Sequence, residues 1–166
     1  PEGIWYAAVS PTDAAEIALA VEAGFTTVKL KAGRDLEAEG KFLDAMAGEF
    51  PALKWRLDFN ESLTPEQAAE FLLGLADRTR ATIDFVEDPC PFSETSWSDL
   101  RRKTRVKLAV DREAAPLSAA AQVMVIKPAV DEPFLLGEAA ISHNQRVVMT
   151  SYMDHPLGQM FAAYEA

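Results

Sequence analysis

The sequence predicts a parallel α/β fold built from repeated strand–helix units. Short apolar runs alternate with amphipathic segments along the chain, which is the pattern of parallel strands joined by helices. Several amphipathic segments also begin with helix-capping residues. No Gly/Ser linker, low-complexity segment or internal repeat beyond the unit period interrupts the alternation. We therefore expect residues 1–166 to form a single domain.

Seven strands are predicted from the apolar runs. Periodicity leaves two architectures open, a (β/α) barrel and a doubly wound open sheet, and the regular β-then-α order favours the barrel. A complete eight-stranded barrel takes about 250 residues, so we expect an incomplete barrel of about seven units, with the last strand outside this sequence. The predicted strands are Ile4–Val9, Thr26–Lys31, Lys54–Phe59, Ile83–Glu87, Val106–Val110, Val123–Lys127 and Arg146–Ser151.

Helices are predicted from start and stop signals between the strands. Ser10 is placed as the N-cap of the first helix, with Pro11 in its first turn. Thr64-Pro65-Glu66-Gln67 predicts a capping box for a later helix. The predicted helices are Ala14–Ala23, Asp35–Phe50, Ala68–Ala76, a short or poor helix over Ala114–Gln122, a helix from Pro133 through Ile141, and Gly158–Ala166.

The bulk composition excludes several classes of function. With 26 acidic and 16 basic residues, the net charge of −10 argues against nucleic acid or an anionic membrane as the main partner. The chain contains no apolar run of about 18 residues, so we expect no membrane span. The first ten residues lack the pattern of a signal peptide. Cys90 is the single cysteine, which excludes an intrachain disulfide and fits a reducing cytoplasm.

Charged side chains stand at the ends of five consecutive predicted strands, from the second to the sixth. The loops that follow barrel strands are where such folds carry their functional groups. Any one of these residues alone is more often a solvated loop residue, and their joint arrangement is what indicates a site. The residues are Lys29 and Lys31, then Asp58 with Asn60, then Glu87, Asp111 and Lys127.

Side-chain alternation predicts where these groups point. If Val28 and Leu30 pack against helices, Lys29 and Lys31 point into the barrel. The same parity turns the three strand-end acids and the sixth-strand lysine inward. Burying so many charges is costly unless they pair or bind a metal.

Three converging carboxylates suit a hard octahedral ion, Mg²⁺ or alternatively Mn²⁺. A metal there can polarise a substrate carboxylate, and lysines beside it can remove a proton from the adjacent carbon. The second ammonium on Lys29 and the metal both favour a neutral Lys31, as a base requires. The pattern predicts abstraction of a proton α to a carboxylate, through an enediolate.

These residues resemble the enolase superfamily, in its muconate-lactonising subgroup. Lys29-Leu30-Lys31 is similar to the K-x-K motif of that family, and Lys127 matches its lysine across the barrel. The resemblance implies a modified TIM barrel, (β/α)7β, and an N-terminal α+β capping domain that this sequence does not show. It implies that Asp58, Glu87 and Asp111 bind the metal.

Within that subgroup the chain most resembles the o-succinylbenzoate synthases of menaquinone biosynthesis. The compact loops, the early position of Lys127 and the segment from Thr150 to Gly158 carry this resemblance. It implies a lyase that dehydrates 2-succinyl-6-hydroxy-2,4-cyclohexadiene-1-carboxylate, a small anionic carboxylate. Lys31 then removes the α proton and protonates the departing hydroxyl, and Lys127 stabilises the anion. Asn60 and Ser151 are implied to bind substrate.

Departures from the family pattern leave alternatives open. Arg112 and Glu113 follow Asp111 where the family commonly has an acid directly, so Glu113 or Asp88 is a candidate partner of the third ligand. His155 is a candidate substrate contact, although a local hydrogen-bonding role is the commoner one. Racemisation of N-acylamino acids or epimerisation of dipeptides uses the same metal and lysines. A barrel without catalysis is the alternative of another class.

Overall fold

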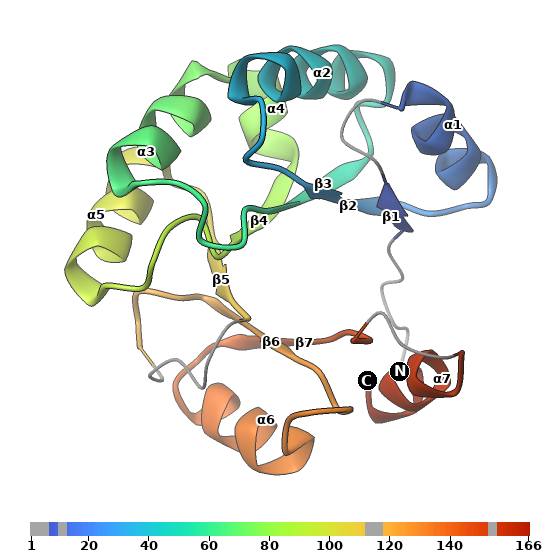
Figure 1. Ribbon diagram of the computed structural model, residues 1–166, viewed down its shortest axis with the longest axis vertical. Helices are drawn as coiled ribbons and strands as arrows, with labels where there is room; N and C mark the ends of the chain where they lie inside the picture. The colour runs from blue at the N-terminus through green and yellow to red at the C-terminus, as the bar shows by residue number, and fades with distance from the viewer. Residues whose placement is uncertain (1–6, 10–12, 112–117, 153–155) are drawn as a thin grey trace.

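The computed structural model describes residues 7–9, 13–111, 118–152 and 156–166. Within these ranges the chain forms a curled, seven-stranded parallel sheet with helices along its outer side (Figure 1). The strands follow one another in sequence order from β1 to β7. This order excludes a doubly wound sheet, which reverses its strand order at a switch point. The barrel-type prediction is confirmed, and the single-domain division stays a prediction.

The seven predicted strands are all present. Their boundaries agree with the predicted ones within two residues wherever the structure describes them, and residues 4–6 lie outside the described ranges. The strands are β1 Ala7–Val9, β2 Thr27–Lys31, β3 Lys54–Asp58, β4 Ile83–Glu87, β5 Leu108–Val110, β6 Val123–Ile126 and β7 Arg146–Met149.

Five of the helices match predicted ones, and α4 and α5 were missed. The short α4 has no side-chain cap to mark its start. The start of α5 does have a sequence signal, since serine is a common N-cap residue. The N-cap is Ser93, whose hydroxyl accepts from the backbone N–H of Ser96. The helices are α1 Ala14–Glu22, α2 Leu36–Glu49, α3 Pro65–Gly74, α4 Asp77–Thr82, α5 Glu94–Thr104, α6 Pro133–Ser142 and α7 Pro156–Glu165.

Two details of the helix predictions were wrong. The N-cap of α1 is Asp13, whose carboxylate accepts from the N–H groups of Ala15 and Glu16 at 2.9 and 3.3 Å. The carboxylate therefore does the capping that Ser10, outside the described residues, was expected to do. The described part of the expected helix over Ala114–Gln122, residues 118–122, is turn and coil. The capping box at Thr64 and Gln67 is confirmed.

The apolar residues form two layers that confirm the predicted parity. The larger layer lies between the sheet and the helices and contains the fully buried Val28 and Leu30. The smaller layer lies inside the curl of the sheet, where Val148 packs against it. Its members come from β4, β5 and β6 and are Phe85, Ala109, Val123 and Val125. Residues of the same parity further along these strands therefore reach the carboxyl ends of the strands on the inner side.

The amino-terminal end of the curled sheet carries a network of three charges. The Asp84 carboxylate accepts from Arg56 of β3 at 2.9 Å and pairs with Arg146 of β7 at the same distance. Both guanidinium groups lie over the Phe85 ring, 4.8 and 5.4 Å from its centroid. One acid on β4 thus links strands on opposite sides of the curl and offsets the charge of the buried Arg56.

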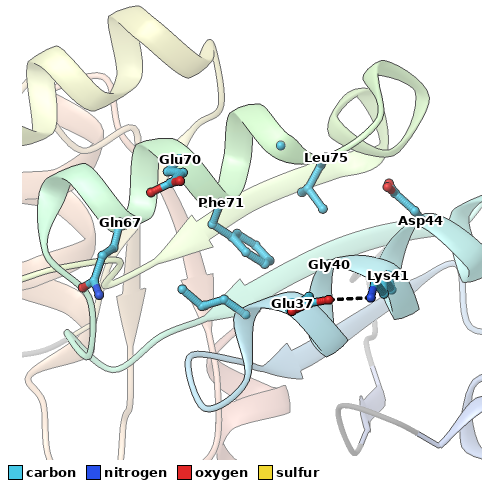
Figure 2. A pocket seen from close by; sticks show the side chains of 10 residues that line it. Glu37, Gly40, Lys41, Asp44, Gln67, Glu70, Phe71 and Leu75 are labelled. Carbon is cyan, nitrogen blue, oxygen red and sulfur yellow. Dashed lines mark hydrogen bonds and ion pairs between the residues drawn. The ribbon is translucent and has the colours of Figure 1, made fainter.

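A groove of about 480 Å³ lies between α2 and α3, among the helices outside the sheet (Figure 2). Phe71, Leu36 and Leu75 supply its apolar lining, and Glu37 and Lys41 form an ion pair at its side. None of the strand-end residues lines this groove, so it is separate from the charged cluster described below.

No helix among the described residues combines the length and the apolar character needed to cross a membrane.

We predict that Asp84→Ala lowers the free energy of unfolding by about 3 kcal/mol, because it removes a carboxylate that lies 2.9 Å from the buried Arg56 guanidinium. Asp99→Ala is the matched control, since Asp99 pairs with Arg102 on the solvent-exposed face of α5. That change alters the free energy by less than about 0.5 kcal/mol. Chemical denaturation of both variants measures the difference, and equal losses would contradict the account of the network.

Candidate functional site

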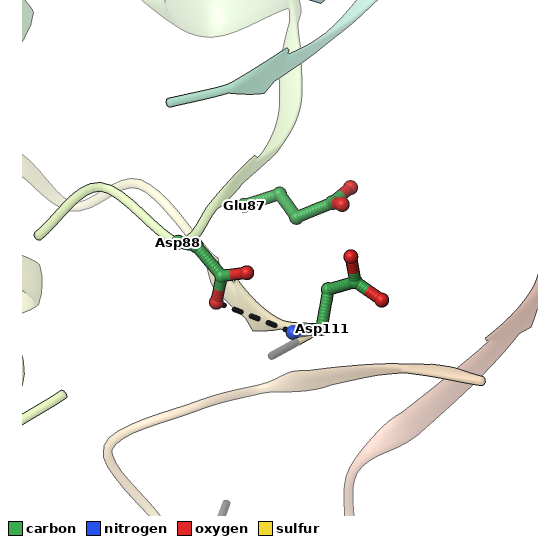
Figure 3. Close-up of side chains that lie close together, drawn as sticks. All are labelled: Glu87, Asp88 and Asp111. Carbon is green, nitrogen blue, oxygen red and sulfur yellow. Dashed lines mark hydrogen bonds between the residues drawn. The ribbon is translucent and has the colours of Figure 1, made fainter. Parts of the chain in front are cut away.

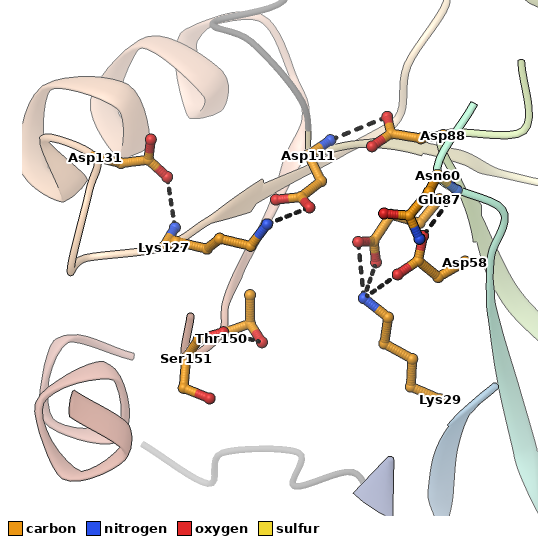
Figure 4. Close-up of polar contacts among 10 residues, drawn as sticks. All are labelled: Lys29, Asp58, Asn60, Glu87, Asp88, Asp111, Lys127, Asp131, Thr150 and Ser151. Carbon is orange, nitrogen blue, oxygen red and sulfur yellow. Dashed lines mark hydrogen bonds and ion pairs between the residues drawn. The ribbon is translucent and has the colours of Figure 1, made fainter. Parts of the chain in front are cut away.

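The strand-end charges come together because neighbouring strands are in register. In the parallel ladder Lys31 pairs with Asp58, Asp58 with Glu87, and Glu87 with Ala109. The carboxyl ends of parallel strands meet at one edge of the sheet, so the side chains that follow them converge (Figure 4). The predicted clustering at one end of the barrel is therefore present.

Lys29 links two of the acids at the centre of this cluster. Its ammonium lies 2.8 and 2.9 Å from the two oxygens of Glu87 and 3.0 Å from Asp58 Oδ2. The Glu87 side chain is 2% exposed and that of Lys29 is 17% exposed. One cation from β2 thus offsets two carboxylates of β3 and β4 that solvent reaches poorly.

The pKa values of Glu87 and Lys29 are both raised, for different reasons. Burial raises the pKa of Glu87 to about 8, against the lowering effect of the Lys29 charge, and Asp58 and Asp111 add to the rise. Burial alone would lower the pKa of Lys29, but the charges of Glu87 and Asp58 outweigh it and hold that pKa above its usual range. Lys29 therefore remains protonated at neutral pH, and its amine is not available as a base.

Asn60 orients Asp58. The backbone N–H and the side-chain amide of Asn60 donate to Asp58 Oδ1 at 3.1 and 2.8 Å. Asn60 has a φ of +49°, a left-handed conformation that asparagine tolerates better than most residues. The contact of Asn60 with Asp58 was not predicted from the sequence. Substrate binding by Asn60 stays a prediction.

Asp88 holds the backbone of Asp111. Its Oδ1 accepts from the N–H of Asp111 at 3.2 Å, and Asp88 is buried with a φ of +41° (Figure 3). Carboxylate oxygens of Glu87, Asp88 and Asp111 lie within 4.8 Å of one another. Asp88 was one of two candidates for supporting the third predicted ligand, and the structure places it there. The other candidate, Glu113, lies outside the described residues.

Lys127 approaches the cluster from the opposite side of the mouth. Its ammonium pairs with Asp111 Oδ2, and its backbone N–H donates to Asp131 Oδ2 at 2.6 Å. The ammonium also lies 5.6 Å from the centroid of the Tyr152 ring. The sequence placed Asp131 only at the start of a helix and gave Tyr152 no role of its own, although Tyr152 stands in the segment that carried part of the resemblance.

Of the remaining predicted residues, Lys31 and Ser151 are described by the structure and His155 is not. Lys31 ends β2 with an exposed side chain, and no ion pair or hydrogen bond of it is seen among the described residues. Ser151 follows β7 and is half-buried, with its carbonyl 3.5 Å from the Thr150 hydroxyl. Their predicted roles stay predictions. His155, a candidate substrate contact, lies outside the described residues.

A buried carboxylate fixes the loop that follows Lys31. The two oxygens of Glu39 accept from the backbone N–H groups of Gly33, Arg34 and Asp35 at 2.8, 3.0 and 3.2 Å. Glu39 is 2% exposed. Because hydrogen bonds to a charged acceptor are strong, this carboxylate anchors the β2–α2 loop beside the barrel mouth. In the sequence, Glu39 is a glutamate in the first turn of α2. A glutamate there predicts a favourable interaction with the helix dipole, but it does not predict hydrogen bonds to the preceding loop.

The donor set fits a divalent cation. Asp111 Oδ1 is buried and has no hydrogen-bond partner in the described structure, although buried polar atoms are normally satisfied. Carboxylate oxygens of Glu87, Asp88 and Asp111 converge within 4.8 Å and are the hard ligands that Mg²⁺ prefers. Glu87 and Asp111 belong to both the predicted and the converging set. The third predicted ligand, Asp58, contacts the cluster through its ion pair with Lys29. The third of the converging carboxylates is Asp88 instead.

The comparisons with known proteins identify the family. Residues 12–131 match the family described as Enolase C-terminal domain-like, which is more than half of the chain. The chain therefore belongs to that family, and the predicted resemblance to the enolase superfamily is confirmed.

Two curated proteins are similar to this chain. The o-succinylbenzoate synthase of Bdellovibrio bacteriovorus is 34% identical over 143 residues, which is 84% of this chain and 43% of that protein. The L-Ala-D/L-amino acid epimerase of Populus trichocarpa is 33% identical over 99 residues, which is 59% of this chain and 23% of that protein. The chain thus spans less than half the length of these curated relatives.

A solved structure confirms the fold. The o-succinylbenzoate synthase of Thermosynechococcus elongatus, complexed with Mg in its active site, superimposes with a TM-score of 0.76 at 24% identity. The match covers 97% of this chain and 56% of that one.

We predict that the affinity for Mg²⁺ rises with pH up to about pH 8. Below the raised pKa of Glu87 the ion must displace a proton from that carboxyl group, so the Kd increases by up to about tenfold for each pH unit below 8. Calorimetric titration in two buffers of different ionisation enthalpy measures the released proton. An affinity that is constant between pH 6 and 8 would contradict this prediction.

We also predict that Asp58, and not Asp88, is the third carboxylate that binds the metal with Glu87 and Asp111. Asp58→Asn removes a charge at the centre of the cluster and should raise the Mg²⁺ Kd more than about tenfold. Asp88→Asn keeps an oxygen that accepts from the Asp111 N–H, and asparagine tolerates the positive φ, so the Kd should change by less than about threefold. The same titration measures both Kd values. A larger increase of the Kd in Asp88→Asn than in Asp58→Asn would contradict this prediction and make Glu87, Asp88 and Asp111 the ligand set.

Proposed function

We propose that this chain carries the catalytic residues of an o-succinylbenzoate synthase, a Mg²⁺-dependent lyase. The observation that carries the proposal is that one barrel mouth brings lysines of β2 and β6 around carboxylates of β3, β4 and β5 (Figure 4). The Bdellovibrio synthase, which aligns with 84% of this chain, supports the choice of reaction. The substrate would be 2-succinyl-6-hydroxy-2,4-cyclohexadiene-1-carboxylate, a small anion.

Lys31 is the base in this proposal. Its exposed side chain at the end of β2 is accessible to substrate, whereas Lys29 is held by Glu87 and Asp58. The amine of Lys31 takes the proton from the carbon next to the substrate carboxylate, leaving the electron pair as an enediolate. The pair then forms the ring double bond as the C–O bond breaks, and the resulting ammonium of Lys31 protonates the departing hydroxyl as water.

Lys127 stabilises the negative charge that develops on the substrate. Its ammonium approaches from β6, on the side of the mouth across from Lys29 (Figure 4). A fixed cation in a poorly solvated site favours an anionic transition state more strongly than it would in water. Asn60 keeps Asp58 oriented, and Glu39 anchors the loop after Lys31. The Ser151 hydroxyl is proposed to bind the succinyl carboxylate.

The acid cluster is proposed to hold Mg²⁺, with Mn²⁺ as a possible substitute. Asp58, Glu87 and Asp111 would hold the ion, which supplies positive charge to bind the substrate carboxylate and acidify the adjacent C–H bond. The same charge offsets the repulsion between an anionic substrate and a chain of net charge −10. A cytoplasmic location fits Cys90, which is a buried free thiol.

Dipeptide epimerisation or N-acylamino acid racemisation is the second candidate. The identity to the Populus epimerase favours it, and the same pair of lysines could act on opposite faces of an α carbon. Epimerisation returns a proton to the carbon, whereas dehydration expels a hydroxyl group. The products therefore separate the two functions.

We predict that the full-length protein with Mg²⁺ forms o-succinylbenzoate, and that Lys31→Ala lowers kcat by at least about 10²-fold, the usual contribution of a general base. Lys41→Ala is the matched control, because Lys41 is an exposed lysine on α2 that pairs with Glu37. Its kcat should equal that of the wild type. Absorbance of the aromatic product follows the reaction.

Two outcomes would contradict the proposal. Turnover that survives in Lys31→Ala would remove Lys31 as the base. The absence of dehydration, with Lys31-dependent exchange of the α proton of N-succinyl amino acids or dipeptides in deuterated water, would establish the second candidate instead.

A further inference from the structure

An exposed aromatic ring stands against the ammonium of Lys127. The Lys127 Nζ atom lies 5.6 Å from the centroid of the Tyr152 ring, within the range of a cation–π contact. Tyr152 is 57% exposed, so burial of its ring in the core does not explain its place at the barrel mouth. We propose that Tyr152 is a positioning residue that holds the Lys127 ammonium against its π face, an inference that rests on the proposed role of Lys127.

The base of the Lys127 side chain is already fixed by the loop after β6. The Lys127 N–H donates to Asp131 Oδ2 at 2.6 Å, and the Lys127 carbonyl accepts from the N–H of Asp131 at 2.9 Å. The flexible part is the four-carbon stem, whose rotamers must be restrained to place a point charge. Contacts at the ammonium end provide such a restraint.

The carboxylate at that end has a second task. Asp111 pairs with Lys127 through Oδ2, and its other oxygen is buried without a hydrogen-bond partner among the described residues. If Asp111 binds a divalent cation, as proposed, its attraction for the ammonium weakens. An aromatic face attracts an ammonium through its quadrupole but cannot accept its proton and does not compete for a hard metal ion. The Tyr152 ring therefore restrains Lys127 in the state in which Asp111 cannot.

Strand parity supports this placement of the ring. Val148 belongs to the layer inside the curled sheet, and the Thr150 N–H continues the pairing to β6 by donating to the Ile126 carbonyl at 2.9 Å. Alternation from Val148 puts Thr150 on the inner side, next to the residue after Ile126, and Tyr152 follows two residues later, beyond the end of β7. The observed contact between Tyr152 and Lys127 agrees with that parity.

Two substitutions in the full-length protein separate the ring from its hydroxyl group. Tyr152→Phe keeps the π face, whereas Tyr152→Leu keeps apolar bulk without it. For dehydration we expect Tyr152→Phe to retain kcat within about twofold and Tyr152→Leu to lower kcat by about threefold to tenfold, the range of a cation–π contact. KM should change by less than about twofold in both, because Lys127 acts on the developing charge.

A second measurement is independent of turnover. In protein labelled at lysine, the Cε resonances of Lys127, assigned by their absence in Lys127→Arg, should show a ring-current shift in the wild type and in Tyr152→Phe. The shift should be lost in Tyr152→Leu, with the melting temperature unchanged because the side chain is exposed.

The inference is overturned if Tyr152→Leu keeps both kcat and the ring-current shift. It is also overturned if Tyr152→Phe loses as much kcat as Tyr152→Leu, since the hydroxyl group would then be the acting part. Absence of dehydration in the wild type would overturn the proposed function, while the resonance shift would still show whether the ring holds Lys127.

Discussion

Burial of carboxylates at the carboxyl ends of the strands is the constraint around which the site is arranged. Glu87 is almost completely excluded from solvent, and the acids beside it would repel one another without nearby cations. Lys29 reaches from β2 to acids on β3 and β4, and Lys127 reaches from β6 to Asp111 after β5. The first lysine therefore joins β2 to β3 and, across β3, to β4, and the second joins the ends of β5 and β6. The charges that suit the site for catalysis also hold its walls together.

The inside of the curled sheet is organised in three levels along the strands. Its amino-terminal level has one acid, Asp84, between two arginines, and its middle level is apolar. Its carboxyl-terminal level carries the acids and lysines of the candidate site. The apolar middle lies between these two charged networks. Because side chains two residues apart share a face, one strand such as β4 contributes Phe85 to the middle and Glu87 to the mouth.

The sequence was sufficient for the architecture and for most of the cluster, because both follow from short-range patterns. Parity predicted that Lys29 and Glu87 lie on the inner side with Phe85, and the ladder register brought them together. Asp88 could be predicted only as one of two candidates, and the contributions of Glu39 and Tyr152 could not be predicted, because they depend on loop conformations and on distances between segments remote in sequence. Serine and aspartate both cap helices, so the sequence does not distinguish Ser10 from Asp13 as the N-cap of α1. Only the backbone path shows that Asp13 is the N-cap.

Binding of a divalent cation by the strand-end carboxylates is the proposal on which the chemistry of the site depends. A crystal structure of the full-length protein grown with Mn²⁺, measured for anomalous scattering, tests it most directly. We expect an anomalous peak at the barrel mouth within about 2.0–2.3 Å of carboxylate oxygens of Glu87 and Asp111. We also expect Lys29 and Lys127 to be displaced from these oxygens. A fully ordered mouth without a peak, in which both lysines keep their ion pairs at saturating Mn²⁺, would contradict it.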